Sequence, residues 1–433
     1  MSRFLKERYR ELAPYTPGEQ PQNRRYIKLN TNESPYPPSP RVLEAILGRL
    51  PEGWREKGSP EESGLKMGSP EENGLKMGSP EENGLKMGRS EESGLKMGSP
   101  EESGGAQMRQ AFIERRQADS FGEEIGKLRL YSDPEARDFC QAVAQYYGVE
   151  PDQVMGGNGS DEILAFAFLA FGGDKASVRF PAISYGFYPV FAQLFGLAAE
   201  PVPLTADFRV DPRDYAACGK DTLIVIANPN APTGICLSLQ EIEGILRGNS
   251  DNLVIIDEAY VDFGGETVIP LIEKYDNLMV VQTFSKSRSL AGARLGFAVS
   301  SKEIIGDMNK MKFSFNPYNI NRLSLLAGAA AIRDREYFQQ CVTAIAATRE
   351  RTAESMRRLG FTVLPSKANF IFAKSEAIKG REYFKKLREK GILVRRWDKP
   401  SIEDFVRITI GTAEEMEAFI KATEEILREE HRG

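Results

Sequence analysis

Residues 223–260 read LIVIANPNAPTGICLSLQEIEGILRGNSDNLVIIDEAY, and this stretch decides the fold. It opens and closes with short apolar runs, Leu223–Ile226 and Leu253–Ile256, which are rich in β-branched residues. Continuous runs of this kind are typical of parallel strands that are covered on both faces. Between them, Ser238 and Glu241 have the spacing of a capping box that opens a helix. Strand, helix and strand in succession predict a layered α/β domain.

The flanking sequence extends this pattern in both directions. Helical stretches are expected at 138–147 and 162–171, and a third buried strand at Leu278–Val281. From about Met308 the chain turns helical, and it then gives short strands and a final helix. These later strands are expected at 370–372, 392–394 and 406–408. We therefore expect a large α/β domain over 126–307, with a mixed, mostly parallel sheet, and a smaller α+β domain over 308–433. Residues 1–50 would form an N-terminal arm and the start of the fold.

Residues 51–125 are of a different kind. The ten-residue unit GSPEESGLKM recurs with little change from Gly58 to Met97, and a truncated copy starts at Gly98. Each unit has two glycines and only Leu and Met as apolar residues. Such a unit cannot bury enough surface to offset the entropy of the chain. The segment is predicted to be a disordered, low-complexity insertion.

Composition excludes several classes of function. The net charge of −5 gives no electrostatic reason to bind nucleic acid or an anionic membrane, and no apolar run approaches the length of a membrane span. The four cysteines lack the spacing of metal ligands or disulfides, which suits a reducing cytoplasm. The single histidine, His431, stands near the C-terminus. A histidine-based triad or zinc site is therefore not expected, and proton chemistry must come from other side chains or from a cofactor.

Four short segments follow predicted strands or open helices. They are Gly157–Asp161 (GNGSD), Asn228–Gly234 (NPNAPTG), Asp257–Tyr260 (DEAY) and Thr283–Lys286 (TFSK), the last followed by Gly292–Gly296 (GARLG). Taken singly, each has an ordinary explanation: a turn, a connector, a capping aspartate or a surface lysine. In open α/β sheets, however, ligands bind beyond the carboxyl ends of the strands. The order and placement of all four segments predict one shared site.

The residue types at these strand ends indicate a particular chemistry. A carboxylate that ends an apolar strand, such as Asp257, needs a cationic partner, and a protonated pyridine nitrogen is one. Lys286 can form a Schiff base, while Ser285 and Arg294 could hold a phosphate through charge-assisted hydrogen bonds. Glycines ahead of a helix, as in 157–161, let the backbone approach a phosphate closely.

With these segments the chain resembles the fold type I aminotransferases, which use pyridoxal 5'-phosphate, and within them the histidinol-phosphate aminotransferases. Further motifs of that group are Lys28–Pro35 (KLNTNESP), Leu130–Pro134 (LYSDP), Asn316–Asn319 (NPYN) and Val406–Thr412 (VRITIGT). The resemblance covers nearly all of the chain except residues about 50 to 125.

The resemblance implies a role for each cofactor residue. Lys286 would carry the cofactor and move protons, Asp257 would keep the pyridine nitrogen protonated, and Tyr260 would donate to the phenolic oxygen. Tyr185, in the stretch Ser184–Tyr188, would stack on the ring. The residues implied for the cofactor phosphate are Ser160, Asp161, Ser285 and Arg294, together with Tyr131 donated across the interface of a homodimer.

The resemblance also implies substrate residues and shows one departure. Arg407 would bind the carboxylate of the amino donor and Arg395 a substrate phosphate, with Tyr15 and Asn369 in the same pocket. The family usually has an Asn that contacts the phenolic oxygen where this chain has Ala231. Asn230 is the expected substitute if the loop shifts.

The expected reaction is therefore transfer of an amino group from L-histidinol phosphate to 2-oxoglutarate in the cytoplasm, by an enzyme with no metal. Two alternatives on the same fold stay open: an aromatic amino-acid aminotransferase and a threonine-phosphate decarboxylase. From another class, the chain could be an interaction protein that acts through its repeat.

Overall fold

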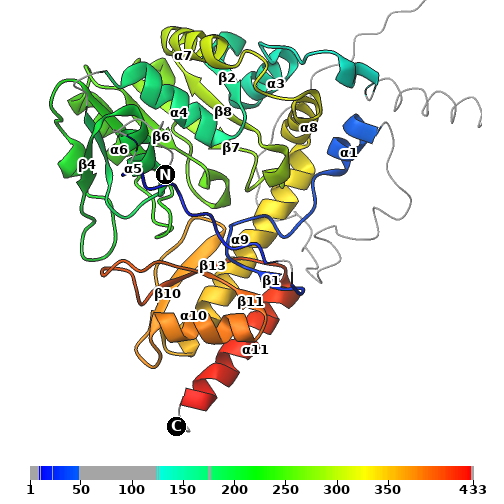
Figure 1. Ribbon diagram of the computed structural model, residues 1–433, viewed down its shortest axis with the longest axis vertical. Helices are drawn as coiled ribbons and strands as arrows, with labels where there is room; N and C mark the ends of the chain where they lie inside the picture. The colour runs from blue at the N-terminus through cyan, green and yellow to red at the C-terminus, as the bar shows by residue number, and fades with distance from the viewer. Residues whose placement is uncertain are drawn as a thin grey trace, which may run out of the picture.

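The computed structural model describes residues 9, 11–21, 23–47, 124, 126–173 and 177–430. The decapeptide repeat and His431 lie outside these residues. The described chain forms a large domain around a seven-stranded sheet and a smaller domain around a four-stranded sheet. Figure 1 shows the N-terminal arm running between the two domains.

The large sheet is mixed and mostly parallel, as predicted. Its strand order is β2-β8-β7-β6-β5-β3-β4. The four pairs from β7 to β4 are parallel, whereas β8 runs antiparallel to both of its neighbours. The strands are β2 Val154–Gly157, β3 Ser177–Pro181, β4 Ala198–Val202, β5 Thr222–Ala227, β6 Val254–Asp257, β7 Leu278–Thr283 and β8 Gly296–Ser300.

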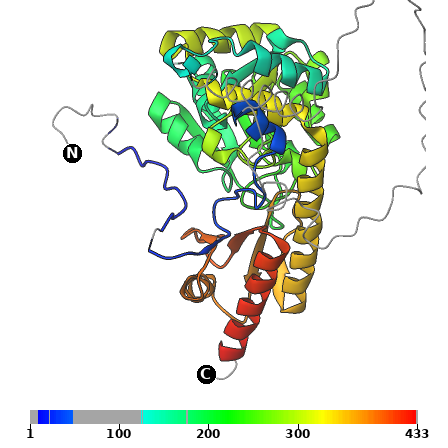
Figure 2. The ribbon, with the colours of Figure 1, turned by 90° about the vertical axis from the view of Figure 1, so that its right-hand side faces the viewer.

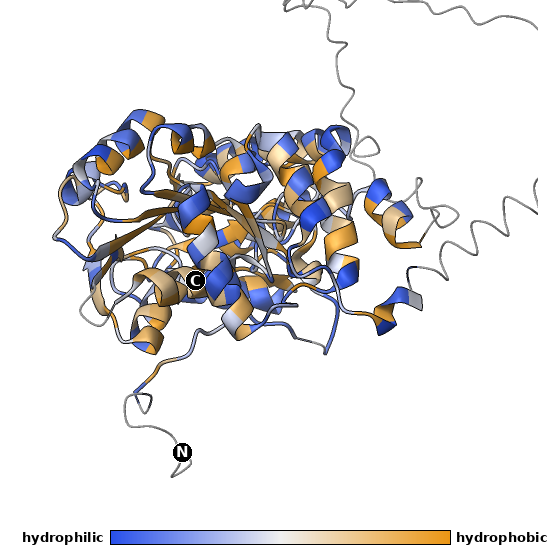
Figure 3. Ribbon diagram, turned by 90° about the horizontal axis from the view of Figure 1, so that it is seen from above, coloured by the Kyte–Doolittle hydropathy of each residue, from blue (hydrophilic) through white to orange (hydrophobic). Residues whose placement is uncertain are grey.

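The central strands are apolar throughout because both of their faces are covered. Successive side chains of a strand point to opposite faces. In β5, Ile224 and Ile226 join one hydrophobic cluster, while Leu223 and Val225 join another on the opposite face. Every residue of β5, β6 and β7 is buried. In Figure 3 the strands lie between helices that carry hydrophilic residues.

Helices cover each face of this sheet. Cluster membership assigns α3 (Arg137–Tyr147), α6 (Leu239–Gly248) and α8 (Arg322–Arg333) to one face. It assigns α4 (Ser160–Phe171), α5 (Phe187–Phe195) and α7 (Lys302–Phe315) to the other. The short helix α1 (Pro40–Leu47) packs against α8. The predicted capping box of α6 is present, with the Glu241 amide donating to Ser238 and the Ser238 amide donating to Glu241.

The smaller domain has the strand order β12-β13-β10-β9 and its own hydrophobic core. Its strands are β9 Phe361–Val363, β10 Phe370–Ser375, β12 Arg395–Arg396 and β13 Val406–Thr409, and its helices are α9 Arg335–Arg358, α10 Gly380–Glu389 and α11 Ala413–Glu430. A two-residue strand of the arm, β1 (Ile27–Lys28), pairs in parallel with β11 (Ile392–Leu393), so the arm is attached to this domain. Figure 2 shows α9 and α11 packed side by side.

The boundary between the domains comes later than expected. Residues 308–333 form most of α7 and all of α8, and these helices pack against α4 and α3 of the large domain. Met308 and Ala327 are accordingly buried in the clusters that flank the large sheet. The chain therefore passes from the core of the large domain to the core of the smaller domain at α9, rather than at residue 308. None of the helices within the described residues is long and apolar enough to cross a membrane.

Candidate functional site

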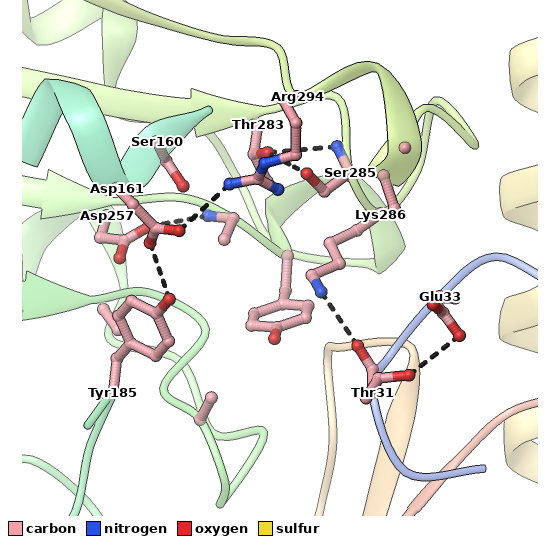
Figure 4. A pocket seen from close by; sticks show the side chains of 16 residues that line it. Thr31, Glu33, Ser160, Asp161, Tyr185, Asp257, Thr283, Ser285, Lys286 and Arg294 are labelled. Carbon is pink, nitrogen blue, oxygen red and sulfur yellow. Dashed lines mark hydrogen bonds and ion pairs between the residues drawn. The ribbon is translucent and has the colours of Figure 1, made fainter. Parts of the chain in front are cut away.

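Two adjoining cavities lie at the carboxyl ends of the central strands. The first has a volume of about 350 Å³ and the second of about 140 Å³. Five residues line both of them, namely Thr31, Tyr185, Ala231, Tyr260 and Lys286. Figure 4 shows how the side chains of the first cavity converge from the large domain and from the N-terminal arm.

The sheet register brings the predicted segments to one edge. The Asn228 amide donates to the Asp257 carbonyl at 2.8 Å, and the Glu258 amide donates to the Val281 carbonyl at 2.8 Å. The parallel strands β5, β6 and β7 therefore end almost level. β6 ends on Asp257, and the loops after β5 and β7 carry residues 228–234 and Lys286 to the same edge of the sheet.

Lys286 lies where the two cavities meet. Its Nζ donates to the carbonyl oxygen of Thr31 at 3.1 Å and lies 6.0 Å from the centre of the Tyr260 ring. Burial lowers the pKa of Lys286 to about 8, and the nearby guanidinium of Arg407 acts in the same direction. No carboxylate among the described residues forms an ion pair with it. A neutral, nucleophilic amine is therefore accessible close to neutral pH.

Asp257 is a buried carboxylate that has neutral partners. One oxygen accepts a hydrogen bond from the Tyr188 hydroxyl at 2.7 Å, and the other accepts one from the Ala259 amide at 3.2 Å. Burial raises the pKa of Asp257 to about 6, although both hydrogen bonds oppose the rise. The group is therefore mainly ionised at neutral pH, and within the described residues it has no cation paired with it. A ligand cation at this position would be strongly favoured.

One end of the first cavity is built for an anion. Ser160 opens α4, whose N-terminal amides favour negative charge. The guanidinium of Arg294 packs so closely on Gly159 that a Cβ there would come within 2.7 Å of Nη2. The Thr283 hydroxyl donates to the Ser285 hydroxyl at 2.9 Å, which leaves the proton of Ser285 for another acceptor.

The side chain of Asp161 has two protein partners at this end of the cavity. Its carboxylate accepts from the Tyr185 hydroxyl at 2.7 Å and pairs with Arg294 at 3.2 Å. Figure 4 shows it between these two side chains. These two contacts hold Arg294 and Tyr185 in place, and the expected contact of Asp161 with the cofactor phosphate stays a prediction.

The second cavity is rich in cations. Arg395 and Arg407 are directly paired in the register of β12 and β13, and both line the cavity beside Tyr15 and Trp397. Arg395 donates to the carbonyls of Thr16 and Pro17, and Arg407 donates to the carbonyl of Asn30 at 3.0 Å. The Nε atom of Arg407 is buried without a partner in the described structure.

Most of the predicted site residues line one of the cavities. The first cavity contains Ser160, Asp161, Tyr185, Asp257, Tyr260, Ser285, Lys286 and Arg294, and the second contains Tyr15, Arg395 and Arg407. Three predicted residues, Asn230, Asn369 and Tyr131, do not line either cavity.

Asn230 has partners within its own loop, and its expected contact with a cofactor stays a prediction. Its side-chain oxygen accepts from Ser184 at 2.7 Å, and its side-chain nitrogen donates to the Ile183 carbonyl and the Thr233 hydroxyl. The amide is thus buried and holds its own loop. The methyl group of Ala231 faces the cavity instead.

Asn369 and Tyr131 occupy other positions. Asn369 is fully buried and donates to the carbonyl of Asn32 at 3.1 Å, so it supports the cavity from behind. Tyr131 is 78% exposed and stacks on Tyr318, with ring centres 4.3 Å apart. Its expected contact is with a second subunit, so that role stays a prediction.

Sequence reasoning missed Tyr188 and Asn32. Tyr188 lies only three residues beyond Tyr185, but no local pattern shows that its hydroxyl meets Asp257. Asn32 donates from its side chain to the Tyr260 hydroxyl at 2.9 Å, across 228 residues of sequence. Contacts this distant in sequence leave no local periodicity from which to predict them.

The first cavity fits pyridoxal phosphate group by group. The anion-binding end, with Ser160, Ser285 and Arg294, suits the phosphate. The unpaired carboxylate of Asp257 suits a protonated ring nitrogen, and the amine of Lys286 suits the aldehyde. These groups line one cavity, with the Tyr185 ring beside them.

Comparison with known proteins agrees with this geometry. Residues 95–422 match the family of class I and II aminotransferases. A histidinol-phosphate aminotransferase of Brachyspira hyodysenteriae is 41% identical over 429 residues, covering 99% of this chain and 100% of that protein. One of Clostridium acetobutylicum is 39% identical over 427 residues, covering 99% and 100%.

A solved structure shares the fold at lower identity. The histidinol-phosphate aminotransferase of Sinorhizobium meliloti, in complex with pyridoxal-5'-phosphate, superposes with a TM-score of 0.69 at 22% identity. The superposition covers 94% of this chain and 92% of the Sinorhizobium meliloti chain. From the family match and the extent of these similarities, the chain belongs to the class I and II aminotransferases.

Proposed function

We propose that this enzyme transfers the amino group of L-histidinol phosphate to 2-oxoglutarate, giving imidazole-acetol phosphate and L-glutamate, a reaction of histidine biosynthesis. The observation that carries the proposal is the charge of the second cavity. It is lined by Arg395, Arg407 and Lys286, and by no carboxylate among the described residues. Neither arginine forms an ion pair within the described chain. A cavity of this kind favours anionic substrates, here the phosphate of L-histidinol phosphate in one half-reaction and the carboxylates of 2-oxoglutarate in the other.

The first cavity would hold the cofactor. Ser160, Ser285 and Arg294 would bind its phosphate, and Asp257 would pair with its ring nitrogen, helped by the Tyr188 hydroxyl. When bound, pyridoxal phosphate supplies a ring that takes up the negative charge developing on the α-carbon of the substrate. Asp161 would keep Arg294 and Tyr185 in place through its two contacts.

Lys286 is the residue placed to move protons. Among the described residues it is the one amine that lines either cavity, and it lines both. Its lowered pKa lets Nζ exist without a proton near neutral pH. The neutral Nζ would accept the proton from the α-carbon of the substrate. It would then give this proton to the carbon atom on the other side of the transferred nitrogen.

The two arginines would bind the substrates in turn. Arg407, with its unpartnered Nε, would bind the α-carboxylate of glutamate, and Arg395 would bind the phosphate of the ester. Trp397 packs against both guanidiniums, with centroid distances of 5.7 Å to Arg395 and 5.3 Å to Arg407. This packing limits the movement of both charges between the two half-reactions.

Two alternatives predict different substrates for the same site. An aromatic aminotransferase would prefer L-phenylalanine, and a threonine-phosphate decarboxylase would release carbon dioxide without consuming 2-oxoglutarate. An interaction protein acting through the repeat would not need the complete set of Lys286, Asp257 and Arg407 in one site.

A panel of donors tests the proposal. L-histidinol phosphate, L-phenylalanine and L-threonine phosphate would each be supplied with 2-oxoglutarate, and glutamate and carbon dioxide measured. We expect kcat/KM for L-histidinol phosphate to exceed that for L-phenylalanine by about tenfold or more, since a charged hydrogen bond is worth about 1.5–3 kcal/mol. Equal values would favour the aromatic enzyme, and carbon dioxide release would favour the decarboxylase.

We also propose a cytoplasmic homodimer. Exposed aromatic residues support the dimer: Tyr131 and Tyr318 stack on the surface of this chain, and Phe315, close to Tyr318 in sequence, is also exposed. Large exposed rings of this kind are enriched where proteins associate. Sedimentation of the purified enzyme tests this, and a monomer at micromolar concentration would contradict it.

A further inference from the structure

The hydroxyl of Tyr260 lies where both cavities meet, and its orientation depends on one residue. The side-chain nitrogen of Asn32 donates to the Tyr260 oxygen at 2.9 Å. The Tyr260 ring is fixed by an edge-on contact with Phe370, with ring centres 5.2 Å apart. The position of the oxygen is therefore set by packing, and the direction of its proton by Asn32.

The direction of the Asn32 amide is itself determined. The Asn32 backbone amide donates to the Thr409 hydroxyl at 3.1 Å, so the Thr409 proton must go elsewhere. It goes to the side-chain oxygen of Asn32 at 2.8 Å. Because that oxygen faces Thr409, the side-chain nitrogen must face Tyr260. The chain of donors runs one way, from Thr409 through Asn32 to Tyr260.

Asn32 is also held firmly by its backbone. Its carbonyl accepts from Asn369 at 3.1 Å, and its φ of +56° lies in the left-handed region. Asn adopts that region more readily than most residues. Asn32 is buried, so it is anchored by β13 and by the residue that precedes β10.

These contacts leave the Tyr260 proton with one place to go. Burial raises the pKa of Tyr260, so the hydroxyl keeps its proton at neutral pH. No atom of the described residues accepts that proton. Ala231, which packs in the same apolar cluster as Tyr260, brings only a methyl group to the cavity. Tyr260 thus offers its hydroxyl proton to this part of the cavity.

We propose that Asn32 is the positioning residue that directs the Tyr260 proton into the cavity, toward the phenolic oxygen of the cofactor. The inference rests on the proposed function, because it assumes the cofactor. It gives this chain a donor arrangement in which Tyr260 is oriented from the N-terminal arm, with no second side-chain donor at position 231.

Absorbance measured against pH tests the inference. The pKa of the linkage between Lys286 and the cofactor rises when the phenolic oxygen loses a donor, because that oxygen then draws more strongly on the proton of the linkage. Asn32→Gly keeps the left-handed backbone and removes the amide, so we expect this pKa to rise by about 0.5–1 unit. Asn32→Asp turns the hydrogen bond around, because the carboxylate accepts the Tyr260 proton, and should raise the pKa about as much as Tyr260→Phe.

Asn30→Ala is the matched control. Asn30 lies two residues away, and its amide donates to the Glu19 carbonyl rather than to Tyr260. Its titration should follow that of the unaltered enzyme. The inference is overturned if Asn32→Gly titrates like Asn30→Ala. If Asn32→Gly does not fold, the inference is overturned if Asn32→Asp titrates like Asn30→Ala. Failure to attach the cofactor to Lys286 in the unaltered enzyme would count against the proposed function instead.

Discussion

Asp257 is a carboxylate in a buried position, where the ionised form is disfavoured. The fold places it at the end of a fully buried strand and gives it two neutral hydrogen-bond donors, the Tyr188 hydroxyl and the Ala259 amide. These two donors do not offset the loss of water, since the pKa of Asp257 is raised from 3.8 to about 6. The protein without cofactor therefore holds an anion whose natural partner is the ligand.

This raised pKa predicts that the ionised Asp257 lowers the stability of the cofactor-free protein while it favours binding of the cofactor. A carboxyl group whose pKa is raised in the folded state stabilises the fold at pH values below its pKa in the unfolded chain. This stabilisation is lost as the pH rises through about 6. The difference amounts to about 3 kcal/mol at neutral pH. Cofactor-free Asp257→Asn should therefore unfold at higher urea concentration than the unaltered enzyme at pH 7, and with little difference near pH 4.

The same variant should bind the cofactor at least about tenfold more weakly, because a buried charge partner is lost. Urea unfolding across this pH range and equilibrium dialysis measure the two effects. A stability difference that does not change with pH would contradict the assignment of the raised pKa to Asp257.

Among the elements, the strands β12 and β13 would carry the substrate specificity of the proposed reaction. Their register sets Arg395 opposite Arg407, and the two side chains serve different anions in the proposed reaction. Arg396 provides a matched control, since it neighbours Arg395 but bonds to Asp398 and to the Glu403 carbonyl outside the second cavity.

Arg407→Ala should weaken the reaction of glutamate more, because the α-carboxylate loses its partner, and Arg395→Ala should weaken the reaction of the phosphorylated donor more than that of glutamate. Each loss should be about tenfold to a hundredfold in kcat/KM, the value of a charged hydrogen bond. Single-turnover kinetics of each half-reaction, with Arg396→Ala in parallel, measure this. Small and equal effects of Arg395→Ala on both substrates would favour a donor without phosphate.

These elements also show how far the sequence could be read. The strands β5, β6 and β7 were predictable because burial on both faces leaves a continuous apolar run. The polar segments that follow them were predictable as a site because parallel strands share their carboxyl edge. The two-residue strands β1 and β12 have no period to detect, and the α7–α8 pair gave no sign of which core it joins.

At the scale of the whole molecule, the site depends on parts that are distant in sequence. The arm supplies Thr31 and Asn32, the large domain supplies Lys286, and the small domain supplies Arg407. The arm pairs with the small domain through β1, while α1 packs on the large domain. A shift of one domain relative to the other would therefore change the positions of residues that line both cavities.

The repeat lies in sequence between α1 and Tyr131, outside the described residues. We expect deletion of Gly58–Gly105 to leave turnover, cofactor retention and dimerisation nearly unchanged, because loop-closure entropy changes only logarithmically with length. Tyr131→Ala is the contrasting variant and should weaken cofactor retention. Sedimentation of the deletion variant during cofactor titration decides the point, and a monomer that sheds cofactor would show that the repeat shapes the interface.

Borohydride labelling tests most directly whether Lys286 carries the cofactor. The enzyme would be loaded with pyridoxal phosphate, reduced with borohydride, digested and mapped by mass spectrometry. Lys312 gives an internal comparison, since burial lowers its pKa too but it donates to the Pro134 carbonyl and lines neither cavity. We expect the label on Lys286 alone, and neither label nor turnover in Lys286→Ala. A label on Lys312 or any other lysine, with Lys286 unmodified, would contradict it.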